Sequence, residues 1–283
     1  MMHVLKTEWL KIRNYPAFWW VMGMTALSYP GINYIFWNMY LEITKKQNAT
    51  GKIAKMLLGN PFTFPETFHT TAYFSSFFVF IPAIVVIMLI TNEYTYKTNR
   101  QNIIDGWSRN QFLLSKFFDV LVITLMVTLL YFIIALIIGI SASTPPFTRI
   151  WEQIRYVWLF ALLTFSQLSF AFLIGFLVRK SFIALSIFVF YFLIVENFVV
   201  NIARIKVRNS DQNIGRFLPY DIGRFMPLEI SDRLIPVPAF LGRLDDQAYK
   251  ASLDAINIHI LYTFMVTGLI WGLCYYFNKK RDL

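Results

Sequence analysis

The sequence predicts an all-α polytopic membrane protein, a single domain over residues 1–283 with six transmembrane helices. Hydrophobic residues make up 57% of the chain and charged residues only 15%, whereas a soluble domain has about 45–50% and about 25%. The apolar residues are gathered into six runs. Each run is long enough to cross the roughly 30 Å hydrocarbon core of a bilayer, which takes about 20 helical residues.

The formal net charge of +10 does not indicate nucleic-acid binding. The Lys and Arg residues flank the apolar runs and do not form one patch, which is the distribution found in membrane proteins. We therefore expect membrane lipids among the partners, and no nucleic acid.

The six spans follow one another along the whole chain. They are expected at about residues 16–37, 72–91, 117–140, 156–178, 182–200 and 258–277. Pro82 lies inside the second span. Only Arg179, Lys180 and Ser181 separate the fourth span from the fifth, so these two should form a tight helical hairpin.

Two segments outside the spans are also expected to be helical. Residues 1–14 mix apolar residues such as Trp9 with charged residues such as Glu8 and Lys11, which is typical of an interfacial helix on the membrane surface. A merely charged flank of the first span is the alternative. The long segment 201–257 holds too many large apolar residues for a disordered linker, and we expect it to fold back as short helices over the outer membrane face.

The distribution of basic residues predicts the orientation. Six spans place both termini on one side of the membrane. The termini, the 92–116 loop and the turn at Arg179 together hold twelve Lys and Arg residues, and the short opposite segments hold six. The rule that basic loops stay cytoplasmic applies to short loops, so segment 201–257, with eight basic residues, is left out. Both termini and the 92–116 loop are therefore expected to be cytoplasmic.

The longest polar interruption in the first half of the chain is this 92–116 loop. Ile103, Ile104 and Trp107 lie at helical spacing within it, and Asn99, Arg100, Asn102 and Asp105 take the other positions. This pattern predicts a short amphipathic helix. Gly106 and Ser108 are stop signals, and Ser108 could also cap a helix that opens at Arg109. The apolar face either docks into a partner or anchors the loop in the lipid headgroup layer, where Trp is common.

Two stretches resemble the ABC-2 class of ABC transporter permeases. In the loop, the matching residues are Glu93, Lys97, Thr98, Arg100, Asp105, Gly106, Ser108, Arg109 and Lys116. At the N-terminus, Glu8 and Lys11 match the Glu-x-x-Lys start of those permeases. The resemblance identifies the short helix as a coupling helix, and it implies short re-entrant helices between spans five and six at the outer mouth.

The resemblance implies a membrane-spanning permease subunit, an exporter of the cytoplasmic (inner) membrane that is driven by ATP hydrolysis in a separate ATPase. Two copies of that ATPase would carry the ATP and Mg, with no cofactor in this chain, and a second permease copy or a paralogue would complete the pathway. The expected ATPase contacts are Glu93, Thr98, Asn99, Arg100, Ile103, Ile104, Asp105, Gly106, Trp107 and Arg109.

Glu196 and Asn197 form a further candidate site near the outer end of span five. An ionisable group within a span is a functional candidate because burying it unpaired is costly. We expect it in the translocation path or at a dimer seam, unless it lies close enough to the interface to be hydrated. Ser166, Gln167 and Ser169 in span four are expected to form interhelical hydrogen bonds.

Motifs for other chemistry are absent from the sequence. It has no G-x-x-x-x-G-K-[ST] phosphate loop and no G-x-S-x-G, and its three His residues and single Cys show no metal-ligand spacing. We therefore do not expect an enzyme. An intramembrane protease or lipid transferase would need facing polar pairs, for which only Glu196 and His259 qualify loosely, and a secondary carrier would usually show internal repeats.

Overall fold

A computed structural model describes residues 2–44, 55–56, 58–145, 149–209, 225–242 and 246–280. The described residues form helices and no strand, as predicted for an all-α protein. The helices of the first half are α1 (Met2–Arg13), α2 (Pro16–Thr44), α4 (Thr67–Ser76), α5 (Phe80–Thr95), α6 (Thr98–Ile104) and α7 (Arg109–Ala142). After a 3₁₀ turn, Ile150–Gln153, follow α8 (Arg155–Val178), α9 (Ser181–Phe190), α10 (Glu196–Asn209), α11 (Pro227–Asp232), α12 (Ala239–Gly242), α13 (Asp246–Asp254) and α14 (Ile256–Lys280).

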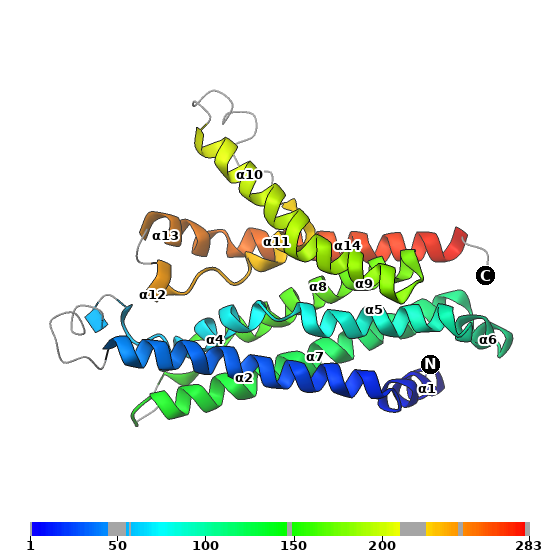
Figure 1. Ribbon diagram of the computed structural model, residues 1–283, viewed down its shortest axis with the longest axis horizontal. Coiled ribbons are helices and arrows are strands. Elements are labelled where there is room, and N and C mark those ends of the chain that lie inside the picture. Colours follow the sequence, from blue (N-terminus) through cyan, green and yellow to red (C-terminus); the bar gives the residue numbers. More distant parts are fainter. Residues whose placement is uncertain are drawn as a thin grey trace.

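The long helices α2, α5, α7, α8 and α14 run along one common direction (Figure 1). Helix α8 lies at the centre, because it packs against α5, α7, α14, α4, α9 and α11. Its inward side chains, among them Phe160, Leu163 and Phe172, are almost fully buried. Helices α1 and α6 and the C-terminal end of α14 lie together at one end of the bundle, and α12 and α13 lie at the other (Figure 1).

Four helical segments are long and apolar enough to cross a membrane. They are Arg109–Ala142, Ile150–Val178, Ser181–Ile202 and Ile256–Lys280. A fifth exists if α4 and α5, which meet at an angle of 51°, are counted as one span. Helix α2 covers the first predicted span and at 29 residues is about 43 Å long, but it is less apolar than the other four. The six predicted spans are thus found as four or five.

The second predicted span, 72–91, is not one straight helix. The chain bends between α4 and α5, and the amides of Phe78, Val79 and Ile81 bond to carbonyls three residues back. Pro82 explains the break, because a proline has no N–H to donate and its ring crowds the carbonyl four residues earlier, that of Phe78. The sequence revealed Pro82 but not the size of the bend.

The hairpin between spans four and five is confirmed. Helix α8 ends at Arg179, whose backbone is left-handed with φ 60°, and α9 begins two residues later at Ser181. Helix α9 continues through a π-helical turn, Tyr191–Val195, into α10. The helix therefore runs on to Asn209, nine residues beyond the predicted end of span five at residue 200.

The segment between α10 and α14 contains short helices, as predicted. Helix α11 packs against both α8 and α14, and Leu234 and Ile235, just after it, are buried. This part of the segment is thus built into the bundle. Residues 210–224 and 243–245 of the predicted segment 201–257 lie outside the described residues.

Candidate functional site

The predicted coupling helix is present as α6, held between two well-defined turns. Lys97 begins it in a left-handed conformation with φ 55°. Gly106, with φ 95°, follows it in a conformation that favours glycine. Ser108 then caps α7, since its Oγ accepts from the amide of Gln111 at 3.2 Å and the Gln111 side chain accepts from the amide of Ser108 at 2.9 Å. The predicted stop signals and the predicted cap are confirmed.

Within this chain, α6 buries polar residues and leaves part of its apolar face outward. Asn99 and Asn102 are buried, whereas the side chain of Ile104 is 84% exposed. Ile103 and Trp107 are half-buried, so the expected face of Ile103, Ile104 and Trp107 is divided. The packing of α6 against α5 and α7 decides which of its residues are buried, and apolar periodicity alone does not. The other exposed residues of α6 and its turn are Arg100, Gln101, Asp105 and Gly106.

Five charged side chains meet directly beneath α6, and we call them the ion cluster: Glu8, Lys11, Glu93, Lys116 and Asp119. Lys116 is the centre, because its Nζ contacts the Glu8 carboxylate directly, the Glu93 Oε1 at 2.9 Å and the Asp119 Oδ2 at 3.3 Å. Lys11 Nζ bridges Glu8 at 2.9 Å and Glu93 at 3.1 Å. The cluster therefore joins three helices, α1, α5 and α7.

Helix α6 is bonded to the ion cluster at its first residue. The hydroxyl of Thr98 donates to Glu93 Oε2 at 2.7 Å. Above the cluster, Lys11 Nζ also lies 5.6 Å from the centre of the Trp107 ring, which is within the range of a cation–π contact. A shift of α6 thus acts directly on Glu93 and, through Trp107, on α1.

Burial makes the ion cluster a stiff junction. Glu8 is 2% exposed, Lys116 3% and Glu93 5%. Taking such charges out of water is costly, and a buried pair holds only when its geometry is good and its remaining polar atoms are satisfied. Glu93 meets this condition with donors from Lys11, Lys116 and Thr98. Removing one partner of a buried pair costs about 3–5 kcal/mol. Separating α1, α5 and α7 at the cluster would therefore cost a large amount of free energy.

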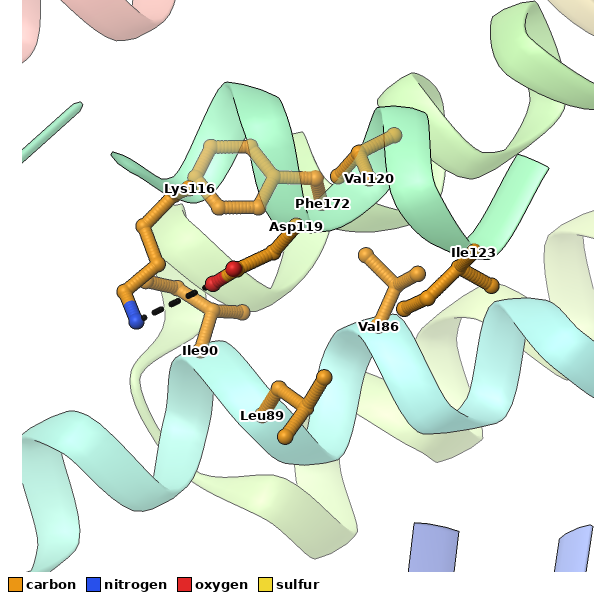
Figure 2. A pocket seen from close by; sticks show the side chains of 8 residues that line it. All are labelled: Val86, Leu89, Ile90, Lys116, Asp119, Val120, Ile123 and Phe172. Carbon is orange, nitrogen blue, oxygen red and sulfur yellow. Dashed lines mark hydrogen bonds and ion pairs between the residues drawn. The ribbon is translucent and has the colours of Figure 1, made fainter. Parts of the chain in front are cut away.

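A small cavity borders the ion cluster on its apolar side. It has a volume of about 10 Å³ and is lined by Val86, Leu89, Ile90, Lys116, Asp119, Val120, Ile123 and Phe172. Figure 2 shows the Asp119 carboxylate turned toward Lys116, with aliphatic side chains on the other side. This space is about the size of one water molecule, so it is too small for a transported substrate.

The sequence left part of this junction out of its candidate site. Glu8, Lys11 and Lys116 belonged to the resembling motifs but were not predicted to meet, and Asp119 was missed. The available signal for Asp119 was an acidic residue within an apolar run, three positions after Lys116. Arg109, predicted to contact an ATPase, faces α14: its Nη1 donates to the Lys279 carbonyl at 3.3 Å, and its own carbonyl accepts from the Asn278 amide at 2.8 Å.

Glu196 lies apart from the ion cluster and is bonded to α11. It is buried, and its Oε1 accepts from the amides of Leu228 at 2.9 Å and Glu229 at 2.6 Å. These are first-turn amides of α11, a position at which a helix offers no carbonyl of its own. Asn197 is exposed and donates to carbonyls of its own helix, Phe192 at 3.1 Å and Leu193 at 3.2 Å.

The predicted interhelical hydrogen bonds of α8 are confirmed for two of three residues. Gln167 Nε2 donates to Asp232 Oδ1 at 2.7 Å, which ties α8 to α11. Ser169 Oγ accepts from Trp271 Nε1 of α14 at 3.0 Å. Ser166 is buried, but within the part of the chain that the structure describes it is not among the residues that join α8 to another helix. Among the described residues, no group of three or more His, Cys, Asp and Glu side chains could hold a metal ion.

The chain is similar to a known protein family. The model of a family described as "ABC-2 family transporter protein" matches residues 4–195. The matched part includes α6 and all five residues of the ion cluster, and it stops before α10, α11 and α14. No curated protein matches the chain.

Proposed function

Because this chain belongs to the ABC-2 family of transporter proteins, we propose that it is the membrane subunit of an ABC exporter driven by a separate ATPase. The chain is an ABC transporter permease and a multi-pass membrane protein. Permeases of this family generally work with an ATPase subunit. The direction of transport, the coupling through α6 and the assembly described below are parts of the proposal.

The observation that carries the proposal is the position of α6 on the ion cluster. An ATPase that closes on ATP needs a protruding element to push against and a stiff connection behind it. Ile104 and Arg100 are exposed on α6, which suits a groove that offers an apolar socket. Behind them, the contacts of Thr98 and Lys116 with Glu93 lead the force into α5 and α7, and Lys11 leads it into α1.

The proposal places α6 and both termini in the cytoplasm of a cell with this chain in its inner membrane. Their common position at one end of the bundle (Figure 1) supports a common side, and the distribution of basic residues supports the cytoplasm. ATP and Mg belong to the partner, since the chain has no phosphate loop. Two ATPase copies and a second permease copy or paralogue complete the complex, with Glu196 and Asn197 at the path or the dimer seam.

A single substitution tests the docking of α6. Burying an isoleucine side chain contributes about 1.5–3 kcal/mol, so Ile104→Asp should weaken the binding of the ATPase about 10- to 100-fold. Binding is measured by titrating the purified permease with its ATPase, and the ATP hydrolysis of the mixture is followed in parallel. The permease alone should hydrolyse no ATP.

The matched control is Met56→Asp. Met56 is 86% exposed and lies outside α6, in the segment between α2 and α4, so this variant should bind the ATPase normally. Equal binding by the Ile104→Asp variant and the unmodified chain, with normal membrane insertion of both, would refute docking through α6.

A further inference from the structure

We propose that α14 carries the movement of the coupling loop to the α11 segment, and that Asn278 and Arg109 are the positioning residues that tie α14 to this loop. The inference rests on the proposed function, because it assumes that α6 is moved by an ATPase. It assigns a role to a helix that lies wholly beyond the part of the chain matched by the family model.

The tie is a pair of reciprocal hydrogen bonds between distant parts of the sequence. Asn278 Nδ2 donates to the carbonyl of Arg109 at 2.8 Å, and Arg109 Nη1 donates to the carbonyl of Lys279 at 3.3 Å. Arg109 is the first residue of α7 and follows directly on the Ser108 cap. The last turn of α14 is therefore fastened at the point where the loop after α6 enters the bundle.

The position of Arg109 indicates that its charge stabilises the C-terminal end of α14 more than it stabilises its own helix, α7. A cation at the first position of a helix is unfavourable for that helix, because the N-terminal end already carries partial positive charge. At the C-terminal end of a helix, the same guanidinium satisfies free carbonyls and is favourable. Arg109 stands at the wrong end of α7 but at the right end of α14.

Trp271 packs α14 against both α7 and α8, on the same helix as Asn278 but farther from its C-terminal end. Its ring centre lies 4.9 Å from that of Phe117 on α7 and 4.9 Å from that of Phe172 on α8. Its Nε1 donates to Ser169 of α8 at 3.0 Å. This contact is part of a longer packing of α14 against α8 and α7.

The rest of α14 is lightly held along its length. Its buried stripe consists largely of small or polar residues, namely Ile256, His259, Thr263, Thr267, Ile270 and Cys274. The opposite face is exposed, with Leu261, Phe264 and Leu269 outward, and a Cβ at Gly268 or Gly272 would meet no neighbouring atom. Apart from Trp271, few large side chains of α14 are buried, and a helix of this kind can move as a rigid body at lower cost.

The far half of α14 reaches the α11 segment. Helix α14 packs against α11, and the ring of Tyr262 lies 5.6 Å from that of Phe225, two residues before α11 begins. A continuous helix thus connects the coupling loop at Asn278 with α11. In physical terms, a shift of α7 at Arg109 pulls on one end of α14 and displaces α11 at the other.

The test follows α11 while ATP acts on α6. The complex of the chain with its ATPase is purified in detergent from a Cys274→Ala background, so that a cysteine introduced at Val237 is the only thiol in the permease. Val237 lies between α11 and α12 and is 41% exposed. The rate of its reaction with a maleimide is measured without nucleotide and with MgATP plus orthovanadate. The unmodified tie should give a rate change of about three- to tenfold.

Asn278→Ala should abolish this change while MgATP hydrolysis by the complex continues, and Asn278→Gln, which keeps the amide donor, should retain most of it. Ser181→Ala is the matched control, because it breaks a different tie, the 2.7 Å contact between Ser181 and Thr91 that joins α9 to α5, and should leave the change intact. Gel filtration verifies that each variant is folded and assembled.

The outcomes separate the two proposals. A full rate change in the Asn278→Ala variant would overturn the role of α14 and leave the proposed function standing. No rate change even with the intact tie, in a complex that binds MgATP and vanadate, would likewise overturn the role of α14 alone, whereas failure of the chain to assemble with its ATPase would overturn the proposed function. Equal loss in the Asn278→Ala and Asn278→Gln variants, with the Ser181→Ala variant also affected, would mean a general loss of packing and would overturn the positioning role.

Discussion

The ion cluster beneath α6 and the contacts around α11 both hold helices together with buried polar side chains, but they use different chemistry. In the ion cluster, three carboxylates share two ammonium groups. Around α11, Glu196 accepts from backbone amides and Gln167 donates to Asp232. A charge pair that is broken inside the protein leaves uncompensated charge, whereas an amide contact that opens to water is easily replaced by hydration.

In the proposed function, the ion cluster transmits force from the ATPase, and the α11 segment is the part that moves. Helices α1, α5, α6 and α7 are joined where separation is most expensive, next to the element that we propose to dock into the ATPase. The α11 segment is attached by contacts that cost less to open. A transporter needs both properties, since a movement produced at a stiff junction is useful only if some other part of the fold can give way.

The largest expected effect is that of removing the centre of the ion cluster. Lys116→Met leaves Glu8, Glu93 and Asp119 with only Lys11 and should destabilise the protein by about 3–5 kcal/mol, seen as a lower midpoint of thermal unfolding in detergent. Lys180→Met, which alters an exposed lysine in the turn between α8 and α9, should melt like the unmodified chain. Identical midpoints for the two variants would show that the ion cluster does not stabilise the fold.

A more direct comparison neutralises one carboxylate in each region. Glu93→Gln removes the charge that faces two ammonium groups and should cost about 3 kcal/mol. Glu196→Gln still offers an amide oxygen to Leu228 and Glu229 and should cost about 1 kcal/mol. Both are measured as shifts of the unfolding midpoint. The contrast drawn between the two regions fails if Glu196→Gln is the more damaging change.

The smallest effect is expected for Gln167→Leu. It removes the hydrogen bond from α8 to Asp232, but Asp232 is exposed and can be hydrated instead, so the loss should be about 0.5–1.5 kcal/mol. Gln247→Leu, at an exposed position of α13, serves as the control. Proteolysis of the α11 segment should become faster in the Gln167→Leu variant although its unfolding midpoint hardly moves. Unchanged cleavage would show that this bond does not hold α11 in place.

Local features of this protein could be predicted from the sequence because their causes are local. The cap at Ser108 depends on Gln111 three residues later, and the hairpin at Arg179 depends on a gap of three residues between two apolar runs. A short helix in the 92–116 loop was also predicted, although the residues that it buries were not. The membrane class follows from composition. The family followed from residues of the 92–116 loop and the N-terminus that resemble those of ABC-2 permeases, and the family match agrees.

The tertiary structure decided what distant residues do for one another. Periodicity could not reveal that Glu8, Glu93 and Lys116 meet, because they lie up to 108 positions apart and each was consistent with a charged flank of its own span. It could not reveal that Glu196 binds α11 or that Arg109 binds α14, because these contacts depend on how the helices pack. Even the exposure of Ile104 depends on how α6 packs against α5 and α7. The sequence determined which segments are helical, since that property adds up along the chain, and its six predicted spans correspond to four or five segments that are apolar enough to cross a membrane. The pairing of charges across helices is fixed only by packing in three dimensions.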